Sequence, residues 1–219
     1  MLRNLCLSAL FVCGLLAAPA LAYEVSQPTF AQQYDVVSLD GDPELERTLL
    51  GELDNAPEMY EIISDHDFVL TAEIRAVPGS ATVPDFTGII VRQKEGLGVE
   101  EVARMAASDA SWAPVGDSPT GLVYQSGPFF SEKVPAGTYR IEVSTPLNTG
   151  KYMLVLGNTP VENGYFATLA AIHMVYEFYG LGTLSMFHSP YVHYPVGCLV
   201  IICLIAGTWY YERRRKHHA

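Results

Sequence analysis

The chain has 219 residues, a formal net charge of −11 and four cysteines. Residues 23–193 contain eight basic and 23 acidic side chains, a formal charge of −15, and so acidic a surface would repel nucleic acid and anionic lipid. All four cysteines lie in the two apolar terminal segments, which excludes a disulfide-rich ectodomain. The length between those segments suits one domain.

Residues 1–22 have the layout of a secretory signal peptide. Arg3 precedes an apolar run from Leu5 to Ala18, and Ala20-Leu21-Ala22 forms an A-x-A cleavage site. A retained N-terminal anchor is the alternative. We therefore expect the rest of the chain to be exported.

Residues 23–157 are expected to form a mainly β domain. Alternating or β-branched runs predict strands at residues 34–39, 60–63, 67–77, 86–93 and 121–133. Residues 111–119 are expected to be a loop.

Two segments of this domain are expected to be short helices. In Pro43–Leu53, leucines at positions 45, 49, 50 and 53 follow a helical spacing after a proline suited to the first turn. In Gly96–Asp109, Val99, Val102 and Met105 would share one helix face, with acids early and Arg104 later.

Two alternating runs, Thr138–Ser144 and Lys151–Gly157, give the clearest strand signal. The turn residues Pro146–Gly150 separate them, so they are expected to form a β-hairpin. Their sequences, VPAGTYRIEVS (134–144) and GKYMLVLG (150–157), resemble the last strands of bacterial and archaeal pre-peptidase C-terminal domains. The motif covers Phe129–Gly157. This resemblance implies a jelly-roll-like antiparallel β-sandwich and a secreted accessory role, without a chemical activity.

Residues 158–193 are expected to form an apolar juxtamembrane helical segment. Tyr165–Tyr179 is apolar almost all round, with one acid and one histidine. It should lie on the outer membrane surface or pack on the anchor; a second span or a re-entrant hairpin is the alternative. Such an apolar surface indicates a membrane protein partner. The residues expected to contact this partner are Tyr165, Phe166, Leu169, Ile172, Tyr176, Phe178 and Phe187.

Residues 194–211 are predicted to be a single transmembrane helix. Pro195–Tyr211 has no charged side chain, and tyrosines and a tryptophan bracket it. The basic block Arg213–Lys216 follows directly, and such a block stays on the cytoplasmic side. Residues 212–219 would thus be a cytoplasmic tail, and the domain would lie in the periplasm or outside the cell.

Two sets of side chains are candidate metal ligands. Three oxygen donors on one turn, as a Ca²⁺ site would have, are Asp40, Asp42 and Glu44. Imidazoles near the expected interface, suited to copper or zinc, are His173, His188 and His193. Histidine tips that reach water at the interface are the simpler interpretation. Asp65-His66-Asp67 is a third and weaker candidate.

No catalytic motif is present: G-x-S-x-G, H-E-x-x-H, C-x-x-C and a glycine-rich phosphate loop are all absent. We therefore expect a non-catalytic binding or accessory subunit for another membrane or envelope protein, without a cofactor. One alternative is a calcium- or metal-dependent carbohydrate-binding module, in which Trp112 and Tyr124 would stack on sugars. The other is a hydrolase whose catalytic residues are scattered along the sequence.

Overall fold

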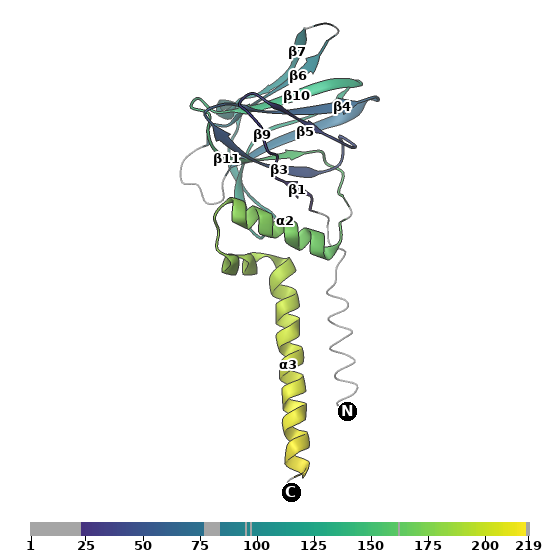
Figure 1. The fold of residues 1–219 in the computed structure, drawn as a ribbon, viewed down its shortest axis with the longest axis vertical. Coiled ribbons are helices and arrows are strands. Elements are labelled where there is room, and N and C mark those ends of the chain that lie inside the picture. The colour runs from purple at the N-terminus through teal and green to yellow at the C-terminus, as the bar shows by residue number, and fades with distance from the viewer. Residues whose placement is uncertain (1–22, 77–83, 95, 97, 162, 218–219) are drawn as a thin grey trace.

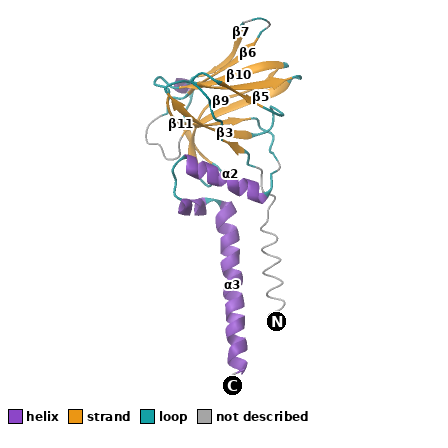
Figure 2. Ribbon diagram, viewed as in Figure 1, coloured by secondary structure: helices purple, strands orange, loops and turns teal. Residues whose placement is uncertain are grey.

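Two packed sheets form the body of the protein, and a long C-terminal helix extends away from them (Figures 1 and 2). The computed structural model describes residues 23–76, 84–94, 96, 98–161 and 163–217. The strand order is β1-β3-β11-β5-β9-β8 in one sheet and β2-β4-β10-β6-β7 in the other. The predicted mainly β sandwich is therefore confirmed. The predicted signal peptide lies outside the described residues.

The larger sheet has six strands and the smaller sheet has five. The larger contains β1 (Val25–Ser26), β3 (Arg47–Asp54), β11 (Thr149–Leu156), β5 (Phe68–Ala76), β9 (Val123–Val134) and β8 (Ala113–Gly116). The smaller contains β2 (Val36–Leu39), β4 (Glu58–Ser64), β10 (Gly137–Ser144), β6 (Thr87–Gln93) and β7 (Val99–Met105). The helical elements are η1 (Ala107–Asp109), α2 (Tyr165–Phe178), η2 (Thr183–His188) and α3 (Pro190–His217). Neighbouring strands are antiparallel, except that β1 and β2 run parallel to β3 and β4.

Alternation along the strands builds the core between the two sheets. Phe68, Leu70 and Ile74 of β5 point into this core, as do Tyr139 and Ile141 of β10. All five are at most 1% exposed. The rings of Phe68 and Tyr139 meet edge to face, with centroids 5.6 Å apart, which is a favoured aromatic geometry.

A second core lies on the outer face of the six-stranded sheet, where α2 covers it. Leu50 of β3 and Met153 of β11 pack there with Ile172 and Val175 of α2. Because β11 is covered on both faces, its residues YMLVL are all buried and do not alternate with polar ones. The helix α2 is thus a third layer of the domain, beneath the sheet in Figure 1.

The helix predicted over residues 43–53 is wrong, because Arg47–Asp54 forms the strand β3. Leu49 and Leu53 face the core between the sheets, whereas Leu50 faces α2. A strand covered on both faces needs apolar residues on both. In β3 the positions of these residues happen to match the spacing expected of one face of a helix.

The helix predicted over residues 96–109 is also wrong, since Val99–Met105 forms the edge strand β7. It pairs with β6, and a bulge between Ile90 and Val91 shifts the register. Val99 is 62% exposed, so few side chains are buried and the apolar pattern is weak. Pairing with β6 decides its conformation.

The two strands of the predicted hairpin form, but they do not pair with each other. β10 pairs with β4 and β6 in the smaller sheet, whereas β11 pairs with β3 and β5 in the larger. The turn between them therefore crosses from one sheet to the other. Alternation locates a strand but does not specify its neighbour, and the correct partners are distant in sequence. The expected loop at 111–119 also contains the short strand β8.

Gly51 of β3 provides a test of the packing. A methyl group there would collide with the Tyr152 ring and lie 2.5 Å from Glu58 Oε2. Gly51→Ala should lower the free energy of unfolding by about 1–3 kcal/mol through overpacking. Thermal and urea unfolding, followed by circular dichroism in mild detergent, would measure this.

Gly116→Ala is the matched control, because nothing lies within 4 Å of the added carbon at this position in β8. Equal stability of the two variants would contradict the packing described for Gly51.

Candidate functional site

The helix α2 has one buried face and one exposed face. Ile172, Val175 and Tyr176 are at most 1% exposed against the sheet. In the first turn of α2, Tyr165 is 37% exposed and Phe166 is 83% exposed. The first turns of α2 therefore present aromatic surface away from the sandwich.

The loop Asp117–Leu122, which lies between β8 and β9, contacts both α2 and the residue before α3. The Tyr176 hydroxyl of α2 donates to the Thr120 carbonyl at 2.9 Å. The Ser189 hydroxyl, directly before α3, donates to the Pro119 carbonyl at 2.7 Å, and Ser189 is fully buried. We call these two hydrogen bonds the anchor clamp. Because buried polar groups must be paired, the clamp fixes where α3 begins relative to the sheets.

Hydrogen bonds within the loop Asp117–Leu122 fix its conformation. Asp117 Oδ2 accepts hydrogen bonds from the backbone N–H of Thr120 at 3.0 Å and from its hydroxyl at 2.5 Å. Gly121 has φ +72° and lies against the carbonyl of His188, so a side chain could not be accommodated there. The close approach of this loop to His188 therefore depends on Gly121.

Lys151 of β11 also contacts the C-terminal end of α2. Its ammonium group donates to the Phe178 carbonyl at 2.7 Å and lies 4.8 Å from the centroid of the Phe178 ring. A cation at a helix C-terminus pairs with the unsatisfied carbonyls and the negative end of the helix dipole. Together with the hydrogen bond of Tyr176, this contact fixes the C-terminal end of α2 on the sheet.

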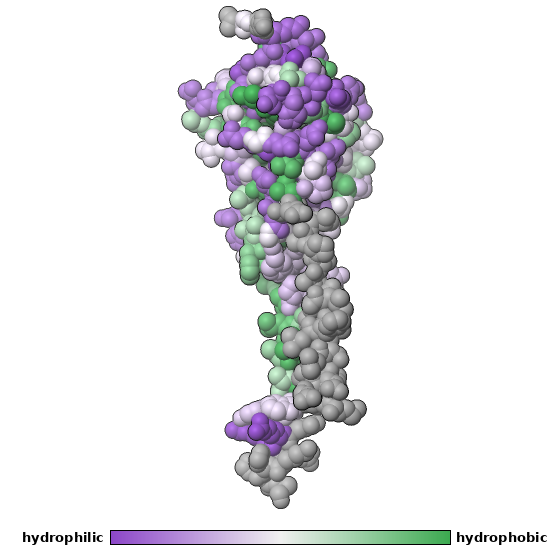
Figure 3. All heavy atoms as spheres, turned by 90° about the vertical axis from the view of Figure 1, so that its right-hand side faces the viewer, coloured by the Kyte–Doolittle hydropathy of each residue, from purple (hydrophilic) through white to green (hydrophobic). Residues whose placement is uncertain are grey.

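Beyond the clamp, α3 is the one helix within the described residues that is long and apolar enough to cross a membrane, over Pro190–Tyr211. Figure 3 shows it as a largely hydrophobic column below a mostly hydrophilic sandwich. The Tyr165 hydroxyl of α2 donates to the Tyr191 carbonyl of α3 at 2.7 Å. The exposed end of α2 therefore lies beside the first turn of α3.

Exposed or partly exposed apolar side chains lie on α2 and η2, the two elements that precede α3. We call this set the apolar collar, and its members are Tyr165, Phe166, Leu169, Leu184 and Phe187. Phe166 and Leu184 are 83% and 82% exposed. In the sequence from Asn163 to His193 the only charged residue is Glu177, whereas the rest of the exported region carries 22 acids. The surface beside the apolar helix is thus nearly free of charge.

The predicted partner contacts divide into two groups. Tyr165, Phe166 and Phe187 are exposed, and Leu169 is partly exposed. The other three, Ile172, Tyr176 and Phe178, are buried in the domain itself, so they are not available to a partner. Leu184 was missed, although its position in an apolar stretch next to the predicted span was a usable signal.

The carboxylates of two acidic candidate ligands, Asp42 and Glu44, already accept hydrogen bonds, whereas Asp40 is contacted at its backbone carbonyl. Asp42 Oδ1 accepts the backbone N–H of Glu44 at 2.9 Å, and Glu44 Oε1 accepts that of Val69 at 2.6 Å. The Asp40 carbonyl accepts a hydrogen bond from the Arg47 guanidinium at 2.6 Å. No group of three or more His, Cys, Asp or Glu side chains within the described ranges is arranged to hold a metal ion.

The histidine candidates make separate local contacts. Nδ1 of His188 lies 2.7 Å from the Ser185 carbonyl, and Nδ1 of His193 lies 3.2 Å from the Phe187 carbonyl. His173 lies 3.7 Å from Glu177 on its own helix. The three imidazoles are not brought together. His66 pairs with the neighbouring Asp65 at 2.8 Å on the surface.

The two aromatic residues considered for sugar stacking have structural roles. Tyr124 is fully buried in the core beneath α2. Trp112 lies against Gly127, and its indole N–H donates to the Ala107 carbonyl at 3.2 Å. Tyr124 therefore offers no face to a carbohydrate.

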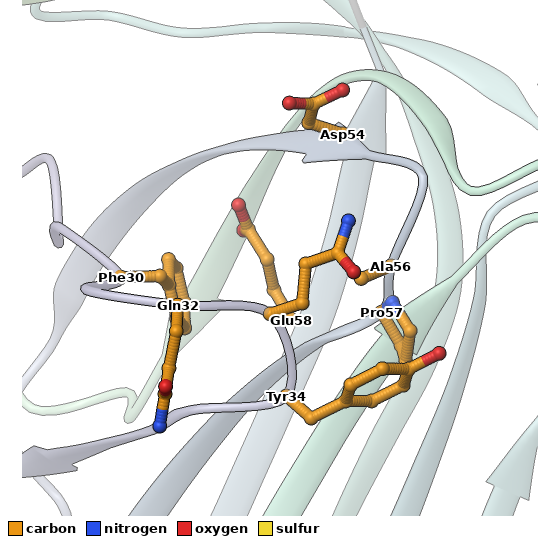
Figure 4. A pocket seen from close by; sticks show the side chains of 8 residues that line it. Phe30, Gln32, Tyr34, Asp54, Ala56, Pro57 and Glu58 are labelled. Carbon is orange, nitrogen blue, oxygen red and sulfur yellow. The ribbon is translucent and has the colours of Figure 1, made fainter.

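A pocket of about 200 Å³ lies at the edge of the sandwich, where the chain crosses from β1 to β2 (Figure 4). The loop that makes this crossing forms one wall, and the turn between β3 and β4 forms the other. The lining residues are Phe30, Gln32, Gln33, Tyr34, Asp54, Ala56, Pro57 and Glu58. Sequence analysis missed this site because its two walls are distant in the sequence.

Glu58 connects the pocket to a buried polar cluster. The hydroxyls of Tyr60 and Tyr152 donate to its Oε2 at 2.9 and 2.6 Å and lie 2.8 Å from each other. Glu58 itself is 9% exposed. Burial raises the pKa of both tyrosines well above the ordinary value, because the phenolate would lose its hydration.

Comparisons with known proteins concern the fold alone. No protein-family model matches the chain, and no curated protein matches its sequence. Among solved structures, it is similar to the pre-peptidase C-terminal domain of a collagenase from Bacillus anthracis, with 10% identity and a TM-score of 0.33. That alignment covers 59% of this chain and 98% of the domain, which is of the type that residues 129–157 resemble. A β-glucosidase from Paenibacillus barengoltzii has 12% identity and a TM-score of 0.21, over 63% of this chain and 13% of the enzyme.

The buried tyrosines predict instability in alkali. Above a pH of about 10 an unfolded tyrosine ionises, whereas Tyr60 and Tyr152 in the folded domain do not. The stability they contribute is thus complete below that pH and is lost as the pH rises, by up to about 1.4 kcal/mol per pH unit for each tyrosine. Urea unfolding at several pH values would measure the slope.

Tyr60→Phe and Tyr152→Phe should each make this slope shallower. A slope unchanged in both variants, or complete ionisation of the tyrosines before unfolding in an absorbance titration, would contradict their burial.

Proposed function

We propose that the protein is a membrane-anchored, non-catalytic subunit of the cell envelope that binds another membrane protein through its apolar collar. The helix α3 crosses the membrane, and the acidic sandwich lies on the outer side, in the periplasm or outside the cell. The basic residues Arg213–Lys216 support this orientation, since such a block is retained in the cytoplasm.

The observation that carries the proposal is the exposure of the apolar collar beside a helix able to span the membrane. Scattered exposed apolar residues are ordinary, whereas a contiguous apolar surface indicates a binding site. Full burial of a phenylalanine or leucine side chain contributes roughly 1.5–3 kcal/mol. Phe166 and Leu184, each more than 80% exposed, are the members that gain most from a partner.

The anchor clamp supports the same conclusion. Because Tyr176 and Ser189 hold the collar and the start of α3 against one loop of the sandwich, the three are presented as a unit. A partner in the membrane could contact α3 and the collar together without first ordering a linker. Preorganisation of this kind lowers the entropic cost of binding.

Purification of the tagged full-length protein in mild detergent, followed by mass spectrometry, tests the proposal. We expect a membrane protein in fixed stoichiometry. The double variant Phe166→Glu with Leu184→Glu should reduce its recovery at least tenfold, because charged side chains would then be placed in an apolar interface.

Phe129→Glu is the matched control, because Phe129 is 62% exposed but lies on β9 of the sandwich. Equal recovery of the partner with the double variant would contradict the role of the collar. A protein that purifies alone, and whose collar variants lose only their binding to phospholipid vesicles, would show that lipid covers the collar.

A further inference from the structure

The pocket at the sandwich edge has the chemistry of a cation-binding site. Its lining residues include the acids Asp54 and Glu58 and no lysine, arginine or histidine. Within the described part of the chain, Glu58 makes no ion pair, although a carboxylate as buried as this one usually has a cationic partner. Among the described residues, only neutral donors, namely two tyrosine hydroxyls and a backbone N–H, therefore contact the Glu58 carboxyl group.

Two aromatic rings complete the pocket. In Figure 4, Glu58 lies between Phe30 on one side and Tyr34 with Pro57 on the other. Phe30 is fixed edge to face against Tyr60, with centroids 5.8 Å apart. Tyr34 is 63% exposed and has φ +66°, a conformation that side-chain-bearing residues seldom adopt. The Tyr34 ring is thus exposed at the pocket, whereas Phe30 packs against the core beside it.

The hydrogen-bonding capacity of the pocket limits the kind of cation. Oε2 of Glu58 already accepts the hydroxyls of Tyr60 and Tyr152, and Oε1 accepts the backbone N–H of Glu52 at 3.3 Å. A primary ammonium would lose hydrogen bonds to water on entering, and Glu58 has few free acceptor positions with which to replace them. A quaternary ammonium has no N–H to satisfy, and it is attracted by ring faces and by a nearby carboxylate.

We propose that the pocket between Phe30, Tyr34 and Glu58 binds a quaternary ammonium group such as that of choline. Its volume of about 200 Å³ is below the range of roughly 300–1,000 Å³ of pockets for drug-sized ligands, so it accommodates a head group and not a larger molecule. The formal charge of −15 on the exported region would also raise the local concentration of cations. This site is independent of the apolar collar and of the proposed partner.

Isothermal titration of the full-length protein with choline chloride, in a maltoside detergent free of choline groups, tests the inference. We expect saturable binding that weakens as the salt concentration rises. The neutral tert-butyl analogue of choline has nearly the same shape and should bind at least tenfold more weakly. Phosphocholine should also bind more weakly, because Asp54 would repel its phosphate, and this comparison separates free choline from a lipid head group as the source.

Variants identify the site. Tyr34→Ala should weaken choline binding about two- to fivefold, the range typical of one exposed cation–π contact. Asp54→Asn and Glu58→Gln should weaken it through loss of charge, and the exposed Asp54 keeps the test valid if the Glu58 variant does not fold. Phe129→Ala and Asp65→Asn, an exposed ring and an exposed acid elsewhere, should leave binding unchanged.

Three results would overturn the inference. These are no saturable binding of choline, equal binding of its neutral analogue, and affinity unchanged in Tyr34→Ala and Asp54→Asn. Tighter binding of Nα-acetyl-lysinamide than of choline would overturn the assignment to a quaternary ammonium.

Discussion

The contact between α2 and the outer face of the six-stranded sheet is the interaction on which the rest of the structure depends. Leu50 and Met153 point out of the sandwich, and without α2 they would face water. Ile172 and Val175 cover them, and burial of each such side chain is favourable by roughly 1.5–3 kcal/mol. The helix that the sequence places near the membrane is thus part of the domain core.

This contact determines what remains for other molecules. Because the sheet covers Ile172, Val175 and Tyr176, only the N-terminal part of α2 and η2 are left to form the apolar collar. The anchor clamp then places the collar beside the start of α3, through Tyr176 and Ser189. The pocket of Glu58 lies on a separate part of the sandwich, between the β1–β2 loop and the turn after β3. The protein could therefore bind a partner at the apolar collar and a soluble cation in the pocket at the same time.

The fold could be predicted where one face of a strand is buried and the other is not. The strands β5 and β10 were identified for this reason, and the apolar length of α3 was equally clear. The strand β3 was not, since its two buried faces remove the alternation that distinguishes a strand from a helix. The pairing of β10 and β11 was predicted wrongly because their neighbours are distant in sequence.

The candidate sites were only partly predictable for similar reasons. An all-apolar helix does not reveal which of its faces is covered, so Ile172 and Phe178 were grouped with Phe166 as partner contacts. The edge pocket joins Tyr34 to Glu58 through the parallel pairing of β2 with β4, and no local pattern indicates that pairing.

The measurement that tests the central claim most directly is amide hydrogen exchange of the full-length protein, in lipid nanodiscs and in detergent. If α2 is a layer of the domain, its amides from Ile172 to Tyr176 will exchange as slowly as those of β11 in both environments, because both open only when the domain unfolds. Rapid exchange in α2 while β11 stays protected, or protection of α2 in nanodiscs alone, would show that α2 is a membrane-surface helix and would contradict this account.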